Sequence, residues 1–138
     1  MEDKFINQLR DEVFENSKSH GFYSLDVKSA DSAGVFHAVL AQKLILIHSE
    51  LSEAVEADRA DNFADLCAFD RETGSDCSDA RFREGFERYV KNSFEDELAD
   101  VIIRVLDVCG WLGIDIQRHI ELKMRYNRGR EFQHGKRY

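Results

Sequence analysis

The chain has 138 residues, and among them are no proline and only eight glycines. Proline and glycine are the residues that most often end helices and form tight turns. A chain with so few of them is poorly suited to a β-sheet with many turns, and it favours long helices. The length fits one domain built around one hydrophobic core.

Cysteine is also scarce. Cys67, Cys77 and Cys109 are odd in number, and the chain has no C-x-x-C sequence, which argues against a disulfide framework and against a zinc knuckle. The amino terminus, MEDKFINQL, does not resemble a signal peptide, and no apolar run reaches the roughly 18 residues of a membrane span. We therefore expect a cytoplasmic protein with no membrane partner.

Charge is abundant but unevenly distributed, and the formal net charge is −8. Residues 118–138 carry seven Lys and Arg residues against two acids, so this end has a charge of +5 and the first 117 residues have −13. An acidic body argues against nucleic acid as a partner. An acidic body with a basic end suits cations in one place and phosphates in another, although a solvated tail would show the same charges.

The apolar residues recur at helical spacing, which predicts an all-α fold with a bundle of four to five helices. We expect a single domain, 1–138. Its parts are an N-terminal helix and loop at 1–34, core helices within 35–59, 79–111 and 115–127, and a basic tail at 128–138.

Two features refine this assignment. Ser93 lies three residues before Asp96, a near variant of the capping box, and it predicts a helix that starts at residue 94. Cys109 falls in an apolar run, where a cysteine behaves as a small core residue.

Two of the predicted helices each carry a pair of acids three residues apart. Glu50 and Glu53 lie in HSELSEAVE, and Glu97 and Asp100 lie in FEDELAD. Residues three apart share one face of a helix, and both faces are bordered by aliphatic residues. One such pair alone is explained by an exposed helix edge. Two pairs in one bundle suggest that the carboxylates face each other.

Four carboxylates in one place would repel, so they need raised pKa values or a counter-ion. Hard divalent cations such as Mg²⁺ take carboxylate oxygens and keep water ligands for a substrate. A di-iron site would use Glu-x-x-His pairs on the helices, and the only such pair here is Glu131 and His134 in the tail. We therefore predict a site for Mg²⁺, with Mn²⁺ as the alternative. Its predicted ligands are Glu50, Glu53, Glu97 and Asp100.

Mg²⁺ in a carboxylate site most often handles phosphate. Lys123 and Asn127 share a face of the last predicted helix, Arg130 follows closely, and Lys43 shares the face that carries Glu50. Lysine and arginine hold phosphate oxygens, and an asparagine amide donates a hydrogen bond to phosphate or ribose. Each of these side chains also fits a solvent-exposed position. As a set they are the predicted substrate-binding residues: Lys43, Lys123, Asn127 and Arg130.

The sequence ELSE at 50–53 followed by ELAD at 97–100 resembles the E-x-x-E … E-x-x-D signature of the MazG-like, all-α nucleoside triphosphate pyrophosphohydrolases. The ending KMRYNRGREFQHGKRY is similar to the tail of small MazG-like proteins. The likeness covers roughly residues 36–59 and 93–138 and does not explain residues 1–34. Forty-three residues separate Glu53 from Glu97, more than in compact members of the family. Residues 60–92 therefore resemble an insertion that bears on substrate choice.

The resemblance implies Mg²⁺-dependent hydrolysis of a nucleoside triphosphate to a monophosphate and pyrophosphate by a homodimer or homotetramer. The four acids would be the metal ligands, and an unligated oxygen of Glu53 is the candidate catalytic base for the attacking water. Two alternatives remain open at this point. One is a non-enzymatic helical interaction protein whose acids are surface charge, and the other is a phosphohydrolase that acts on a different diphosphate-containing substrate.

Removal of residues 128–138 tests the role of the tail. The segment is basic and poor in apolar residues, so it can bury little surface. We expect the KM for the nucleoside triphosphate to rise about tenfold, which corresponds to a loss of about 1.4 kcal/mol of binding free energy. The free energy of unfolding should change by less than about 0.5 kcal/mol. Steady-state kinetics and thermal melting measure both quantities. Unchanged KM and turnover would show that the tail is merely solvated.

Overall fold

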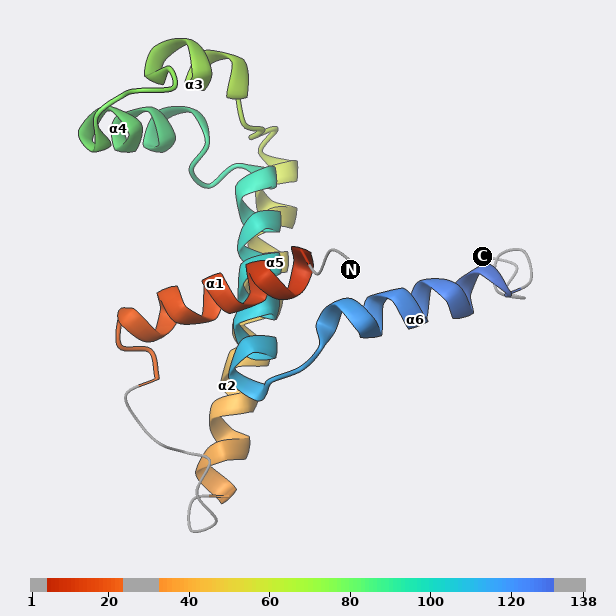
Figure 1. The fold of residues 1–138 in the computed structure, drawn as a ribbon. Helices are drawn as coiled ribbons and strands as arrows, with labels where there is room; N and C mark the ends of the chain where they lie inside the picture. The colour runs from red at the N-terminus through yellow and green to blue at the C-terminus, as the bar shows by residue number, and fades with distance from the viewer. Residues whose placement is uncertain (1–4, 24–32, 131–138) are drawn as a thin grey trace. The chain divides into compact units, whose positions relative to one another are not determined.

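The computed structural model describes residues 5–23 and 33–130, which form six helices and no strand (Figure 1). The prediction of an all-α fold is therefore confirmed. The sequence indicated four or five helices, and the described residues also include a short helix within the stretch 60–78. The six helices are α1 (Phe5–Ser19), α2 (Ala33–Arg59), α3 (Leu66–Thr73), α4 (Asp79–Tyr89), α5 (Phe94–Leu112) and α6 (Ile116–Arg128).

The helices fall into two compact units. The first contains α1, α6 and residues 106–112 of α5, and the second contains α2, α3, α4 and residues 94–105 of α5. That the whole chain forms a single domain stays a prediction. None of the described helices combines the length and the apolar character needed to cross a lipid bilayer.

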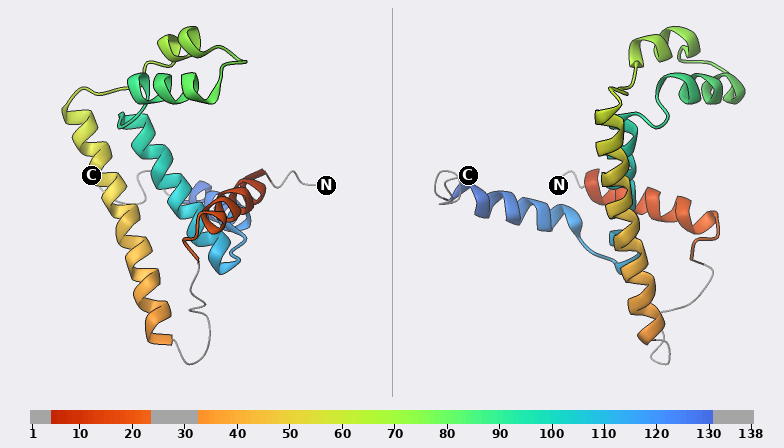
Figure 2. Two further views of the ribbon diagram at one scale, coloured as in Figure 1. Left: turned by 90° about the vertical axis from the view of Figure 1, so that its left-hand side faces the viewer. Right: turned by 180° about the vertical axis from the view of Figure 1, so that it is seen from behind.

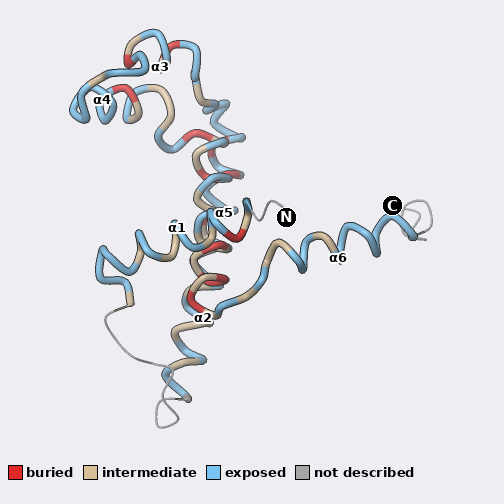
Figure 3. Tube along the Cα trace, viewed as in Figure 1, coloured by how far each residue is buried: buried red, intermediate tan, exposed pale blue. Residues whose placement is uncertain are grey.

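The apolar core of the first unit lies on α5. Leu106, Cys109 and Trp111 are buried, and the buried stretch is visible in Figure 3. The prediction that Cys109 is a small core residue is confirmed. Phe14 of α1 packs directly on Gly110, because a Cβ atom added there would lie 2.5 Å from the Phe14 Cβ. Glycine therefore allows α1 and α5 to approach closely.

Polar contacts join α1 to the start of α6. The buried Asn7 donates from Nδ2 to Asp115 Oδ1 at 2.7 Å, and the same oxygen accepts from the backbone N–H of Arg118 at 3.0 Å. Arg10 donates from Nη1 to the carbonyl of Ile114 at 2.6 Å. Asp115 thus caps α6 and anchors it to α1 with one carboxylate.

In the second unit, α2 and α5 lie side by side (Figure 2). Hydrogen bonds tie the end of α2 to the start of α5. The backbone N–H of Phe94 donates to the carbonyl of Asn62 at 2.9 Å, and Asn62 Nδ2 donates to the carbonyl of Asn92 at 2.7 Å. The N–H of Ala64 donates to Glu95 Oε2 at 2.9 Å. These bonds fix the offset between the two helices at this end.

The predicted cap of α5 is confirmed. Ser93 Oγ accepts from the N–H of Asp96 at 3.2 Å, and Asp96 Oδ2 accepts from the N–H of Asn92 at 2.8 Å. Ser93 is almost completely buried. The cap therefore begins α5 and satisfies backbone donors that would otherwise be unpaired at its amino terminus.

Helices α3 and α4 form a hairpin in the second unit. Gly85 lies at their contact, because a Cβ atom there would come within 2.6 Å of Thr73 Cγ2. Glu72 accepts from Arg88 Nη1 at 2.9 Å and from the Tyr89 hydroxyl at 2.6 Å. The bond from Tyr89, followed by the charge of Arg88, lowers the pKa of Glu72.

Substitution of Gly110 by alanine tests the contact between α1 and α5. Overpacking of this kind costs about 1–3 kcal/mol, and the better helix propensity of alanine returns no more than about 1 kcal/mol. We expect a net loss of stability in chemical denaturation. Gly34→Ala is the matched control, because Gly34 is also helical and has no neighbour within 4 Å. Equal stability of the two variants would contradict the close packing at Gly110.

Candidate metal centre

Three of the four predicted metal ligands meet between α2 and α5. Glu50, Glu97 and Asp100 each place a carboxylate oxygen so that the three oxygens lie within 4.8 Å of one another. Glu50 and Glu97 are buried, with 6% and 5% of their surface exposed. Asp100 is the most exposed of the three. We call these three residues the acid cluster.

The position of the acid cluster follows from the buried face of each helix. Glu50, Ala54 and Ala57 are the buried residues of α2 between 50 and 59, and their spacing of four and three places them on one face. The alanines are small, so this face carries no bulky side chain over the two turns that follow Glu50. On α5, Glu97 lies one turn after the buried Ser93. Both acids therefore occupy positions that would otherwise hold core residues.

Arg104 supplies a positive charge beside the cluster. Its Nη2 lies 2.6 Å from Glu50 Oε1, and the side chains of Arg104 and Glu50 are 41% and 8% exposed. Asp107, three residues after Arg104 on α5, accepts a hydrogen bond from the Tyr23 hydroxyl at 2.5 Å in the first unit. One arginine cannot balance all the nearby acids.

The remaining repulsion appears in the pKa values. Burial raises the pKa of Glu97, and the charges of Glu53, Glu50 and Asp100 raise it further. Burial also raises the pKa of Asp100, with Asp96 and Glu50 adding to the effect and Arg104 opposing it. Both carboxyl groups therefore hold a proton more tightly than usual. A site of this kind favours added positive charge, whether as a proton or as a cation.

Glu53, the fourth predicted ligand and the candidate base, lies outside the acid cluster. Its side chain is exposed, and Oε1 accepts a long hydrogen bond from Ser49 Oγ at 3.4 Å. Its charge still raises the pKa of Glu97 and of Asp100. Glu53 is thus near the rim of the cluster, and its catalytic role stays a prediction.

The predicted phosphate-binding residues lie on two helices. Lys43 is half-buried on α2, two turns before Glu50, in the same unit as the acid cluster. Lys123 and Asn127 are exposed on α6, and Arg130 follows that helix in the first unit. The structure brings the acids together, and the substrate-binding roles of these four residues stay predictions.

Tyr126 organises part of the basic end and was not anticipated from the sequence. Lys123 Nζ lies 5.3 Å, and the Arg130 guanidinium carbon 5.9 Å, from the centre of the Tyr126 ring. Contacts of this kind contribute about 0.5–1 kcal/mol at exposed sites. The three-residue spacing of Lys123 and Tyr126 was the available signal. Two of the predicted phosphate contacts therefore lie against one aromatic ring.

The donor set of the acid cluster consists of carboxylate oxygens, with no histidine or cysteine among its members. Oxygen donors suit hard cations such as Mg²⁺, Mn²⁺ and Ca²⁺ better than the softer metals. The residues present therefore fit the predicted cation. No protein-family model, no curated protein and no solved structure matches the chain. The likeness to the MazG-like family thus rests on the motifs alone.

Substitution of Glu97 by glutamine tests whether the acid cluster stabilises or strains the fold. The variant removes one repelling charge and nearly preserves shape. In EDTA at neutral pH we expect its free energy of unfolding to match or exceed that of the parent, by up to about 1 kcal/mol. In Mg²⁺ the order should reverse, because the parent gains RT ln(1 + [L]/Kd) and the variant loses most of it.

The pH dependence has a defined sign. The pKa of Glu97 is higher in the folded state than in the unfolded state, so ionisation of Glu97 destabilises the fold. The full destabilisation is present at pH values above the folded-state pKa, and none is present below the unfolded-state pKa. The advantage of the variant in EDTA should therefore shrink as the pH falls toward the ordinary value of 4.5. Glu12→Gln, on an exposed position of α1, is the control. If Glu97→Gln melts well below the parent in EDTA, the carboxylate holds the fold instead.

Proposed function

We propose that the protein is a Mg²⁺-dependent nucleoside triphosphate pyrophosphohydrolase of the MazG-like type, with Mn²⁺ as an alternative metal. The products would be a nucleoside monophosphate and pyrophosphate. The observation that carries the proposal is the acid cluster. Glu50, from the E-x-x-E sequence, and Glu97 and Asp100, from the E-x-x-D sequence, place oxygens within 4.8 Å of one another although they lie far apart in the chain.

In this proposal the acid cluster binds the cation. Glu50, Glu97 and Asp100 supply carboxylate oxygens, and in the absence of metal Arg104 holds Glu50 by the ion pair at 2.6 Å. Arg104 is close enough to compete with a cation for the same oxygen. A bound Mg²⁺ would neutralise phosphate charge and lower the pKa of the attacking water.

Glu53 is the proposed general base. Its carboxylate is exposed, and among the described residues 5–23 and 33–130 it accepts one long hydrogen bond, from Ser49. An oxygen is therefore available to accept the proton of a water molecule. Lys43, Lys123, Asn127 and Arg130 are the proposed contacts to the triphosphate. Lys123 and Arg130 are already gathered around Tyr126, which reduces the entropy lost when they bind phosphate oxygens.

We propose that the protein is a cytoplasmic homodimer or homotetramer. Leu44, Leu51 and Val55 recur at helical spacing on α2, yet in one chain they are 53%, 45% and 48% exposed. On α5, Leu98 and Ile102 are also exposed. Exposed apolar residues grouped on a helix face mark contacts between proteins. A second copy of the chain would cover them.

The burial of the acids bears on the alternative of an interaction protein with acidic surface charge. Surface acids are not expected at 5–6% exposure, which is the exposure of Glu50 and Glu97. The second alternative is a phosphohydrolase with another diphosphate-containing substrate. It uses the same cluster, and product analysis separates it from the proposal.

Incubation with a panel of ribo- and deoxyribonucleoside triphosphates and Mg²⁺ tests the activity. We expect monophosphate and pyrophosphate as products, and no turnover in EDTA. Asp100→Asn should lower kcat by about 100-fold or more, as expected when a preorganised charge at a reacting phosphate is lost. Glu12→Gln should match the parent. Release of orthophosphate without pyrophosphate, or unchanged activity in EDTA, would reject the proposal.

A further inference from the structure

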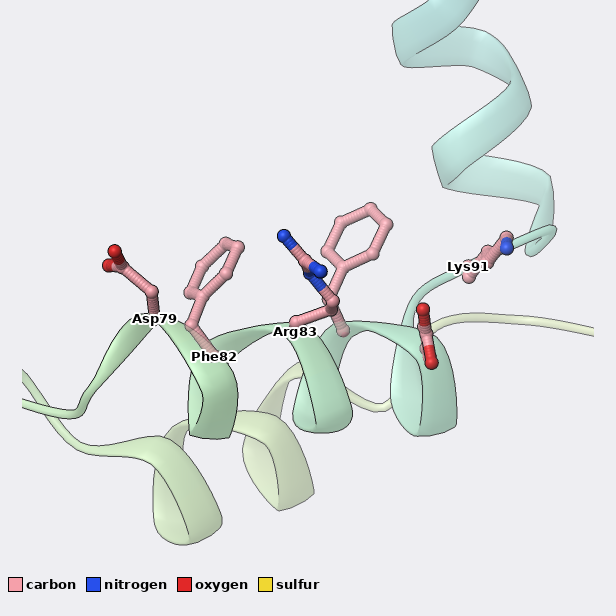
Figure 4. Close-up of a pocket in the computed structure, with 6 residues that line it drawn as sticks. Asp79, Phe82, Arg83 and Lys91 are labelled. Carbon is pink, nitrogen blue, oxygen red and sulfur yellow. The ribbon is translucent and has the colours of Figure 1, made fainter.

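One face of α4 carries two phenylalanines that α3 covers only in part: Phe69 of α3 packs edge-on against Phe82, with the ring centres 5.6 Å apart. The face contains Phe82 and Phe86, whose rings stack with their centres 6.1 Å apart and an angle of 21° between their planes. The side chain of Phe82 stands between those of Asp79 and Arg83 (Figure 4). Phe82 is 51% exposed. Charged residues surround the rings, and together they line a hollow of about 450 Å³. We call this surface the aromatic face, and it consists of Asp79, Phe82, Arg83, Phe86, Glu87 and Lys91.

The opposite side of α4 is already occupied. Gly85 is packed against Thr73, while Arg88 and Tyr89 bond to Glu72 of α3. At 100° per residue these contacts place α3 on the side of α4 turned away from Arg83 and Glu87. The Tyr89 hydroxyl is thus bonded to α3 and does not belong to the aromatic face.

The charges of the aromatic face alternate in sign. Asp79, Arg83 and Glu87 lie on α4 at intervals of four residues, and Lys91 follows two residues after the end of α4. The order of the charges is negative, positive, negative, positive. In the described part of the chain none of the four forms an ion pair. In an antiparallel copy of the same segment the order is reversed, so each negative charge lies opposite a positive charge and each positive charge lies opposite a negative one.

We propose that the aromatic face binds the same face of a second copy of the chain, with the two α4 helices antiparallel about a two-fold axis at the level of Gly85. In this register Asp79 lies opposite Lys91 of the partner subunit, and Arg83 lies opposite Glu87 of the partner subunit. The symmetry doubles each pair. Such an interface is isologous, since the same surface serves both copies.

The same register interleaves the phenylalanines. A helix rises about 1.5 Å per residue, so Phe82 lies about 4.5 Å before the axis and Phe86 about 1.5 Å after it. The second copy places its rings at the mirrored levels. The four rings then alternate between the two chains at steps of about 3 Å along the helix. Both the charge pairing and the ring packing are therefore met by one arrangement.

A second copy fits this face better than a partner of uniform charge. A uniformly acidic or basic partner would leave two of the four charges facing like charges, which disfavours binding. The contact is small, because an 11-residue helix is about 16 Å long. We therefore expect association at micromolar concentrations. The inference locates one contact of the proposed homo-oligomer and rests on that part of the proposed function, and it does not depend on hydrolysis.

Charge reversal in the full-length chain tests the inference. Arg83→Glu places an acid opposite the acid at position 87, and Glu87→Arg places a base opposite the base at position 83. Each variant alone should sediment at half the mass of the parent assembly at micromolar concentrations. An equimolar mixture should regain the parent mass, because each variant complements the other across the two-fold axis.

Arg71→Glu is the control, since Arg71 is exposed on α3. This substitution changes the net charge by the same amount as Arg83→Glu, at a position outside the aromatic face. It should leave the assembly unchanged. Circular dichroism establishes that each variant is folded. The inference is overturned if the parent is a monomer throughout, if a single variant keeps the parent mass, or if the mixture of folded variants does not restore it. The hydrolysis assay is independent, so it fails or succeeds separately.

Discussion

The hydrogen bonds of Asn62 with Asn92 and Phe94 determine how the second unit is organised. They hold the end of α2 against the start of α5 at 2.7 and 2.9 Å. Helices are stiff, so the link between the end of α2 and the start of α5 also determines which turns of α2 lie opposite which turns of α5 further along. A slip of one turn would displace one helix by about 5.4 Å. That exceeds the 4.8 Å within which the oxygens of the acid cluster lie, so the cluster depends on this link.

The acid cluster lowers the free energy of unfolding relative to apolar residues at the same positions. Buried carboxylates lose hydration, and like charges repel, so apolar residues at Glu50 and Glu97 would pack at lower cost. Arg104 offsets part of the repulsion through Glu50, and it leaves the raised pKa values of Glu97 and Asp100. Local choices that work against stability are common at functional sites. The cluster is such a choice on two separate helices.

Much of the fold could be predicted, because the period of apolar residues fixes both the class of structure and the face of a helix on which a residue lies. The cap at Ser93 and the positions of Glu50 and Glu97 on the buried faces of their helices follow from such local rules. Periodicity does not fix the axial offset between two helices, which is why Glu53 was placed in the cluster although it lies outside. Nor does it identify long-range polar partners. The bond from the Tyr89 hydroxyl to Glu72 of α3 is an example.

The segment between Asn62 and Asn92 begins and ends at the hydrogen bonds that join Asn62 to Asn92 and to Phe94. It contains α3 and α4, whose main contacts are with each other. A shorter turn between the same two points would leave α2 and α5 in register, because their link lies at its base. The segment is therefore modular. Mutation and recombination can lengthen, replace or delete the hairpin, and with it a surface for other chains, while the carboxylates keep their places.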